Sequence, residues 1–258
     1  MIFNFFLLFF ILRSVLYIKV LAPMAGICNG DFALKLIPYG FDTVTLGGFN
    51  IDKLSIDAGS KIIKRGRKEF NIPYSKIISF IDDEASKVKN NSDAQVSVNL
   101  RSVNPDRIIE VSKLESVDIV EINCHCRQEE LQRISCGQAM LERPDLKDYI
   151  KKVVDNSDAQ VSVKIRGNVD DVDTLAISKL IDDAGADYLH VDAMKPGIFD
   201  ADYDLISKIS NNTNIFIIGN NSIDSLDKVH KILNAGADGF SIARAAINGK
   251  LNFDLNDI

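Results

Sequence analysis

Two stretches of this chain, NSDAQVSVNLR at residues 91–101 and NSDAQVSVKIR at residues 156–166, begin with the same eight residues and differ at the ninth. After the shared alanine, apolar and polar residues alternate, which is the period of a β-strand. This alternation places the ninth residue, Asn99 in one copy and Lys164 in the other, on the inward face near the C-terminal end of its strand. A chance repeat or a relic of duplication would explain the shared residues. A lysine that points inward, however, needs an anionic or hydrogen-bonding partner, so we expect one scaffold strand used twice to present different groups to a ligand.

Short apolar runs rich in β-branched residues recur along the chain and alternate with amphipathic stretches of helical period. We expect helices at residues 74–89, 173–185 and 225–236, and strands at residues 18–22, 42–47, 95–100, 118–123, 160–166, 187–192, 214–219 and 238–243. Nearly continuous apolar strands that alternate with helices are typical of a parallel sheet that is buried on both faces. Eight such strands in 258 residues predict an α/β fold, a single-domain (β/α)8 TIM barrel over residues 17–258.

The weaker alternative is a doubly wound open sheet. Such a sheet normally carries a glycine-rich G-x-G-x-x-G turn after an early strand. The corresponding segment here is APMAG at residues 22–26, which does not match. The repeated device in DAGADYLHV (183–191) and NAGADGFSI (234–242) fits the barrel better, because it predicts a helix closed by Gly185 or Gly236, a short turn and the next strand.

Composition limits the class of protein. The formal net charge of −6 argues against a protein that coats nucleic acid along its whole surface, although it leaves room for a local basic patch. Four cysteines and no convincing secretory signal indicate reduced thiols in the cytoplasm. Residues 1–16 are almost entirely apolar but short for a membrane span, and Arg13 interrupts them. We expect a dispensable N-terminal extension; a membrane-associating segment and packing under the barrel are the alternatives.

Polar residues follow the later strands at positions that would meet at one rim of the barrel. Lys164 and His190 end the fifth and sixth strands, and the loops after the seventh and eighth strands carry Asn220, Asn221, Ala243 and Arg244. These two loops are the usual phosphate site of this fold. Taken singly, His190 could be a core histidine and Arg244 a surface residue. Their order along the strand ends favours a phosphorylated ligand.

The segment EINCHCRQEELQRISCGQAML (121–141) is dense in groups that can carry chemistry: Cys124, His125, Cys126 and Cys136. Three thiols and an imidazole could bind zinc, but the C-x-C spacing lacks the usual C-x2-C geometry, so no metal is expected. A thiol that acts as a general acid is the favoured interpretation, because an unperturbed cysteine is mostly protonated at neutral pH. The neighbouring Arg127 works against that role, since a cation favours the thiolate.

Several of these motifs together resemble the tRNA-dihydrouridine synthase family: VLAPMAG (20–26), INCHC (122–126), CGQAML (136–141), VKIRG (163–167), the histidine of the sixth strand, IIGNNSI (217–223) and GADGFSIARAA (236–246). The resemblance covers about residues 18–249 in the expected order. It implies an FMN-dependent oxidoreductase in which flavin passes a hydride to C6 of a uridine in tRNA and a loop cysteine protonates C5, with NADPH or NADH as electron donor.

The resemblance also implies a role for individual residues. Pro23 and Met24 would line the flavin, Asn99 stands where the family usually has Gln, Lys164 would contact the pyrimidine edge of the flavin, and His190 would lie against it. Asn123 would hold the substrate or the ring, and Cys126 occupies the position of the acid. The residues expected to hold the FMN phosphate are Asn220, Asn221, Ala243 and Arg244.

This sequence also departs from the family pattern elsewhere. The usual GCP is HCR at residues 125–127, and Asn221 and Ala243 each replace a glycine. The family usually continues into a helical tRNA-binding domain, whereas this sequence ends at Ile258; we therefore expect a short member, of the archaeal type, that lacks this domain. A basic segment after the second strand could contact RNA phosphates or a nicotinamide donor, or could simply be solvated: Lys61, Lys64, Arg65, Arg67 and Lys68.

Two other functions remain open from the sequence. One is a flavin-dependent reductase of a free small molecule, such as a pyrimidine in the manner of the dihydroorotate dehydrogenases. The other is a barrel without redox chemistry that binds a phosphorylated ligand through the loops after its seventh and eighth strands.

Overall fold

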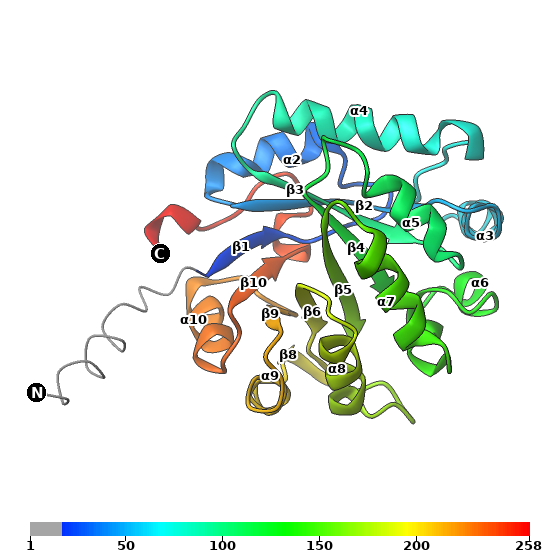
Figure 1. Cartoon of the computed structure of the whole chain (residues 1–258). Helices are drawn as coiled ribbons and strands as arrows, with labels where there is room; N and C mark the ends of the chain where they lie inside the picture. Colours follow the sequence, from blue (N-terminus) through cyan, green and yellow to red (C-terminus); the bar gives the residue numbers. More distant parts are fainter. Residues whose placement is uncertain (1–16) are drawn as a thin grey trace, which may run out of the picture.

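A computed structural model describes residues 17–258, and the expected extension at residues 1–16 lies outside the described part. Eight parallel strands form a closed barrel (Figure 1). Their bounds, in barrel order, are β1 (Ile18–Leu21), β2 (Thr43–Asn50), β3 (Gln95–Arg101), β4 (Ile119–Cys124), β5 (Gln160–Arg166), β6 (Tyr188–Asp192), β9 (Phe216–Asn220) and β10 (Gly239–Ile242). The barrel closes where β10 pairs with β1, from Gly239 opposite Ile18 to Ile242 opposite Leu21. The predicted TIM barrel is confirmed.

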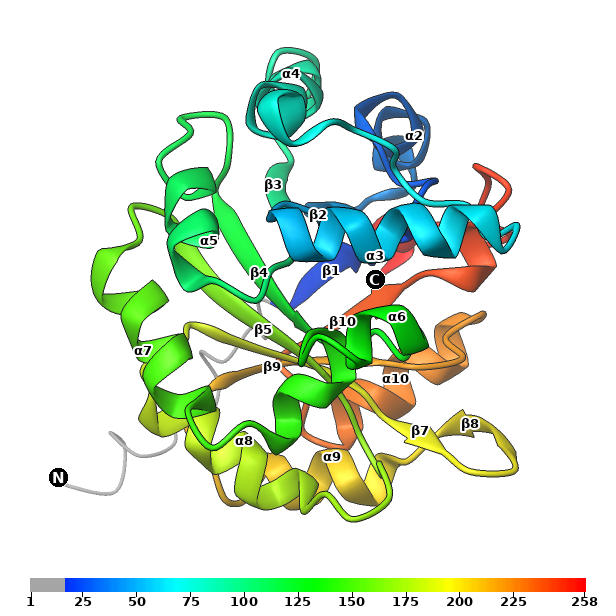
Figure 2. The same ribbon diagram turned by 90° about the vertical axis from the view of Figure 1, so that its right-hand side faces the viewer.

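Helices surround the barrel and connect successive strands (Figure 2). They are α2 (Gly30–Leu36), α3 (Lys53–Lys64), α4 (Ile77–Lys89), α5 (Pro105–Val111), α6 (Glu129–Gln132), α7 (Leu146–Asn156), α8 (Thr174–Asp183), α9 (Tyr203–Ser210) and α10 (Leu226–Asn234). Short 3-10 helices occupy residues Ile37–Tyr39, Tyr74–Lys76, Gly137–Glu142, Arg244–Ala246 and Leu255–Asp257. In the described residues no helix is both long and apolar enough to cross a membrane.

The helix ends follow from local sequence signals. Asp173 caps α8, since its carboxylate accepts hydrogen bonds from the backbone N–H groups of Leu175 and Ala176. Gly185 (φ +84°) and Gly236 (φ +100°) come two residues after the last residues of α8 and α10. This left-handed backbone is one that glycine adopts without steric cost, so both predicted helix-closing turns are confirmed.

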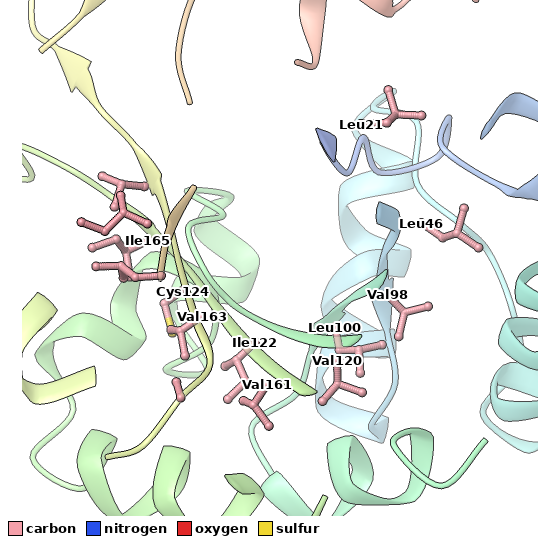
Figure 3. Packing of buried hydrophobic residues seen from close by; sticks show 14 of the residues in the cluster. Leu21, Leu46, Val98, Leu100, Val120, Ile122, Cys124, Val161, Val163 and Ile165 are labelled. Atoms are coloured by element: carbon pink, nitrogen blue, oxygen red, sulfur yellow. The ribbon is translucent and has the colours of Figure 1, made fainter. Parts of the chain in front are cut away.

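The repeated octapeptide forms equivalent parts of β3 and β5, and each strand continues through the three residues after it. On β3 the alternate residues Val96, Val98 and Leu100 are fully buried, and Val161, Val163 and Ile165 occupy the same positions on β5. Figure 3 shows Val98, Leu100 and the three residues of β5. The other set of alternate residues faces the barrel interior, where polar side chains gather. The period-two pattern thus separates an apolar outer face, which holds the helices, from an inner face that is free to build a site.

One element was not anticipated. β7 (Met194–Lys195) and β8 (Ile198–Ala201) form a separate antiparallel hairpin between β6 and α9. The hairpin projects beside the barrel opening (Figure 2). A Pro-Gly turn at residues 196–197 joins its two strands, and Gly197 has φ +75°.

Candidate active site at the barrel mouth

A cavity of about 820 Å³ opens at the C-terminal ends of the barrel strands, the end that faces the viewer in Figure 2. Residues predicted from the sequence to bind a cofactor or act in catalysis gather here. Ten of them line the cavity: Pro23, Met24, Asn99, Asn123, Cys126, Lys164, Asn220, Asn221, Ala243 and Arg244. The structure therefore brings together residues that are up to 221 positions apart in the chain, counted from Pro23 to Arg244.

His190 is the one predicted residue of the catalytic and cofactor set that does not line the cavity. Its side chain is fully buried, and its Nε2 lies 2.7 Å from Lys164 Nζ. On its other side Nδ1 lies 2.7 Å from Oε2 of Glu121. Because Nδ1–H donates to this carboxylate, Nε2 is left as an acceptor for the ammonium group of Lys164. His190 therefore contacts the lysine from the barrel interior rather than from the cavity.

Glu121 is the centre of a buried polar network that the sequence did not reveal. Its carboxylate accepts hydrogen bonds from Asn99 Nδ2 (2.7 Å) and Ser162 Oγ (3.1 Å) in addition to its contact with His190. Burial opposes ionisation, but the interactions with His190, with Lys164 and with the Asn99 amide outweigh it and lower the pKa of Glu121 to about 2. Glu121 is therefore an anion at neutral pH, and it supplies the partner that an inward lysine requires.

Lys164 is buried except for the surface that it presents to the cavity. Burial lowers the pKa of its amine to about 8, against the opposing charges of Glu121 and Asp192. The side chain is thus mostly cationic at neutral pH, and the cost of burying its charge is only partly compensated by protein groups. An anionic or electron-rich ligand in the cavity would supply further compensation.

Asn123 fixes the loop that carries the candidate acid. Its Oδ1 accepts hydrogen bonds from the backbone N–H groups of His125 (3.1 Å) and Cys126 (2.9 Å). Its Nδ2 donates to Oδ1 of Asn99 at 2.7 Å, which joins the loop to the Glu121 network. Cys126 lines the cavity and is only 7% exposed, so its side chain is at the cavity wall and largely shielded from bulk solvent.

The other cysteines are core residues. Cys28, Cys124 and Cys136 are fully buried and free. Burial raises the pKa of Cys28 and of Cys136 to about 12, and that of Cys124 further, so all three remain protonated. Within the described part of the chain, no group of three or more His, Cys, Asp or Glu side chains is placed to hold a metal ion.

His125, one of the two neighbours of Cys126 that depart from the family pattern, makes defined contacts. His125 Nε2 lies 2.6 Å from Asp192 Oδ2 and 2.9 Å from Arg166 Nη2. Asn221 Nδ2 donates to the other carboxylate oxygen of Asp192 at 2.6 Å. Burial, opposed by Asp192, lowers the pKa of His125 to about 4, so its imidazole is neutral at physiological pH. A polar cluster of four side chains thus forms one wall of the cavity.

The loop after β9 has the backbone of an anion site. Asn221 has φ +128° and Ser222 φ +50°, and the backbone N–H groups of residues 221–223 make no hydrogen bond to any described residue. Arg244 Nη2 lies 3.2 Å from Ser222 Oγ and faces the same cavity. Successive free N–H groups next to a guanidinium suit a phosphate. The φ of Ala243 is −119°, so this position does not need the left-handed backbone that favours glycine.

The five cations of the predicted basic segment do not lie together in the structure. Only Arg67 of its five cations lines the cavity, where it also approaches Glu69 at 3.4 Å. Arg65 is turned toward α6 and makes two contacts with Glu130, at 2.8 and 2.9 Å. The three remaining residues are exposed on α3 or in the loop that follows it: Lys61, Lys64 and Lys68. They do not line the cavity.

Two buried donors indicate that a ligand belongs in the cavity. Nε of Arg101 and Nε of Arg166 are buried, and neither has a hydrogen-bond partner among the described residues. Both arginines line the cavity. Buried donors are rarely left unpaired in a native structure. Together with the loop after β9 and Lys164, these donors would suit a ligand that carries a phosphate and polar ring atoms.

Sequence reasoning did not find Glu121, Arg101, Arg166 and Asp192 as parts of this site. Each lies on a barrel strand at an inward position of the period-two pattern. A charged residue at such a position was the signal available in the sequence.

The sequence of this chain is similar to those of several known proteins. The family model described as Dihydrouridine synthase (Dus) matches residues 75–250. An uncharacterized protein of Methanocaldococcus jannaschii is 38% identical over 245 residues, which cover 91% of each chain. The tRNA-dihydrouridine synthase B of Pasteurella multocida is 25% identical over 238 residues, which cover 88% of this chain and 65% of that protein.

Among solved structures, FabK from Thermotoga maritima superposes with a TM-score of 0.58 at 14% identity, over 89% of this chain and 58% of that chain. The N-acetylmannosamine-6-phosphate 2-epimerase of Clostridium perfringens gives a TM-score of 0.55 at 11% identity, over 90% and 87% of the two chains. These likenesses concern the fold alone. The family model, which spans more than half of the sequence, shows that this chain belongs to the dihydrouridine synthase family.

Proposed function

We propose that this protein is an FMN-dependent oxidoreductase that reduces the C5–C6 bond of uridine in tRNA, with NADPH or NADH as the electron donor. The observation that carries the proposal is the convergence on one cavity of a near-buried cysteine, a buried lysine and a loop suited to phosphate. The proposal extends the family membership to a cofactor and to individual residues.

The residues of the cavity fit FMN in two parts. Asn220, Asn221 and Arg244 would hold the phosphate against the free N–H groups of the loop after β9. Asn99 and Lys164 would contact the polar edge of the ring system, and Pro23 and Met24 would line it from β1. When bound, FMN supplies a hydride to C6 of the uracil ring and is reduced in turn by the nicotinamide donor.

Cys126 is the proposed general acid. Its thiol donates a proton to C5, so that the C5–C6 double bond gains a hydride and a proton in total, and the resulting thiolate takes up a proton from solvent. Asn123 positions the thiol, because it fixes the backbone N–H of Cys126 at 2.9 Å and is itself held by Asn99.

Lys164 would place a positive charge beside the ring where negative charge gathers during reduction. His190 and Glu121 hold the ammonium group in place, since Nζ lies 2.7 Å from His190 Nε2 and the imidazole is fixed by the carboxylate. This arrangement makes His190 and Glu121 positioning residues and Lys164 the group that meets the cofactor.

The test begins with purified protein, whose cofactor is released and identified, and then incubated with NADPH and unmodified tRNA transcripts. We expect FMN to be released and dihydrouridine to form. Cys126→Ala should keep its FMN and its reduction by NADPH but lose roughly 10²- to 10⁴-fold in the rate of dihydrouridine formation, because a positioned acid contributes about this much.

Other outcomes would change the assignment. Reduction of uracil or orotate with no product in tRNA would favour the reductase of a free small molecule. If the protein neither carries nor takes up FMN, the remaining function is that of a barrel that binds a phosphorylated ligand without redox chemistry. A Cys126→Ala variant with the turnover of the parent would remove the acid role while leaving the rest of the proposal intact.

A further inference from the structure

The hairpin beside the cavity carries an unusually exposed aromatic side chain. Phe199 is 89% exposed and lines the cavity edge. The preceding Ile198 is 53% exposed, and Ile247, which lines the same cavity, is 43% exposed. These are three of the five large apolar side chains that are exposed in residues 17–258. Phe199 and Ile247 therefore lie at the edge of a polar cavity, where an exposed aromatic ring is available to a bound partner.

The base of the hairpin is firmly held, which gives the aromatic ring a defined place. Asn168 Nδ2 donates to the backbone oxygen of Met194 at 2.8 Å and to the carboxylate of Asp202 at 3.0 Å. The backbone N–H of Asp202 donates to the oxygen of Ala193 at 2.8 Å, which closes the base. A partner that packs on Phe199 therefore meets an anchored β-hairpin with antiparallel pairing of its own.

Positive charge predominates around the cavity and favours an anionic partner. Two acidic residues, Asp192 and Asp224, line the cavity, against six cations: Arg67, Arg101, Arg127, Lys164, Arg166 and Arg244. The chain as a whole carries −6, so positive charge is concentrated at this one place. Arg127 is exposed, and its guanidinium has no hydrogen-bond or ion-pair partner among residues 17–258. An exposed aromatic ring at the edge of a cavity that is also lined by arginines is a combination with which proteins hold single-stranded nucleic acid.

We propose that the β7–β8 hairpin is a stacking platform for an unpaired RNA base that neighbours the target uridine, with Phe199 as the ring on which the base lies. The inference rests on the proposed function, because it needs a uridine that enters the cavity. A uracil base that enters such a cavity must leave the stack of RNA bases. The base next to it then loses a stacking partner at the cavity edge. Phe199 replaces that partner, while Arg67 and Arg127 meet the flanking phosphates.

The test compares three variants for binding to an unmodified tRNA transcript. Phe199→Ala should bind about 5- to 150-fold more weakly, the range expected for loss of one aromatic stack. Phe199→Trp should bind like the parent, since its ring also stacks. Leu54→Ala is the matched control, because Leu54 is 54% exposed on α3 and does not line this cavity. FMN content should be the same in all of them.

Salt dependence separates stacking from charge. Phe199→Ala should leave the slope of log affinity against log salt unchanged, whereas Arg127→Ala should reduce the slope by about the contribution of one phosphate contact. Unchanged affinity of Phe199→Ala in protein that forms dihydrouridine would overturn the platform and leave the proposed function standing. Failure of the parent protein to bind the transcript would overturn both. Self-association that Phe199→Ala abolishes, with RNA affinity unchanged, would assign the surface to a second copy and overturn the platform.

Discussion

A single amide, Asn123, joins the two halves of the proposed chemistry. Its oxygen holds the backbone of the loop with Cys126, and its nitrogen donates to Asn99, which in turn donates to Glu121. Glu121 holds His190, and His190 contacts Lys164. The candidate acid and the buried cation are thus the ends of one chain of hydrogen bonds. A substitution at any member should therefore alter the positions of the other side chains in the chain.

The ionisation of Glu121 makes a prediction about stability and pH. The folded-state pKa is about 2, below the ordinary 4.5, so the folded protein binds fewer protons than the unfolded chain between these values. The stabilisation from this group is present above about pH 4.5 and is lost as the pH falls toward 2. A difference of this size corresponds to roughly 3 kcal/mol. Denaturant unfolding from pH 6 to pH 2 should show this loss.

Glu121→Gln is the comparison for this prediction. The variant keeps the shape but not the charge, so it should be less stable than the parent at pH 6, with a weaker dependence on pH below 4.5. Asp183→Asn is a suitable control, because its partner Lys147 holds it in an exposed ion pair of 3.2 Å that contributes little. Parallel pH curves for the parent and Glu121→Gln would contradict the assignment.

At the scale of elements, one strand sequence serves two purposes. β3 and β5 both carry two valines and then a larger aliphatic residue, Leu100 or Ile165, on the outward face, so both present an apolar face to the helices. They differ at the inward ninth residue, where Asn99 relays a hydrogen bond and Lys164 brings a charge. Scaffold and site are therefore separable along a strand, since alternate residues face opposite sides.

Lys164→Asn tests this separation, because it makes the ninth residues of the two copies identical. The apolar face is untouched, so the far-ultraviolet circular dichroism and the solubility should match those of the parent. Cofactor affinity should fall at least about tenfold, since the ring loses a charged partner worth roughly 1.5 kcal/mol or more. Lys179→Asn, on the exposed face of α8, is the control. Normal cofactor content in Lys164→Asn would refute a role for this lysine in binding.

The elements themselves were predictable because their signals are local. Short apolar runs rich in β-branched residues marked all eight barrel strands, and Gly185 and Gly236 marked two helix ends. The contacts of the site were less predictable: His190 was placed at the ligand from its position in the strand, whereas its fully buried place beneath Lys164 depends on Glu121, 69 residues away. The hairpin was missed because its strands are too short to show a period, although Pro196 and Gly197 followed by two large apolar residues were a turn signal.

At the scale of the molecule, the barrel depends on the seam between its first and last strands. Gly239 lies opposite Ile18 in this seam, and a β-carbon added to Gly239 would come within 2.7 Å of the backbone oxygen of Ile18. Backbone cannot move aside as a side chain tip can. The seam therefore requires a residue without a side chain at this position, for a reason of space.

Gly239→Ala should accordingly destabilise the whole barrel. We expect a loss of about 1–3 kcal/mol in the free energy of unfolding, the usual cost of forcing an extra methyl group into a packed site. Thermal unfolding should show a single transition at a lower temperature, since the barrel strands form one cooperative unit. An unchanged melting temperature would mean that β1 and β10 can move apart enough to accept the methyl group without loss of stability, which would contradict the prediction.

The closed base of the β7–β8 hairpin has a consequence for protein engineering. The chain leaves the barrel at Ala193 and returns at Asp202, and a backbone hydrogen bond of 2.8 Å already joins these two points. The barrel strands are paired without any help from the hairpin. The segment between the two points is therefore an exchangeable cassette: its length and sequence can be varied in a library while the barrel stays constant. On the proposed function, selection from such a library would yield variants that accept RNAs with a different neighbour beside the uridine.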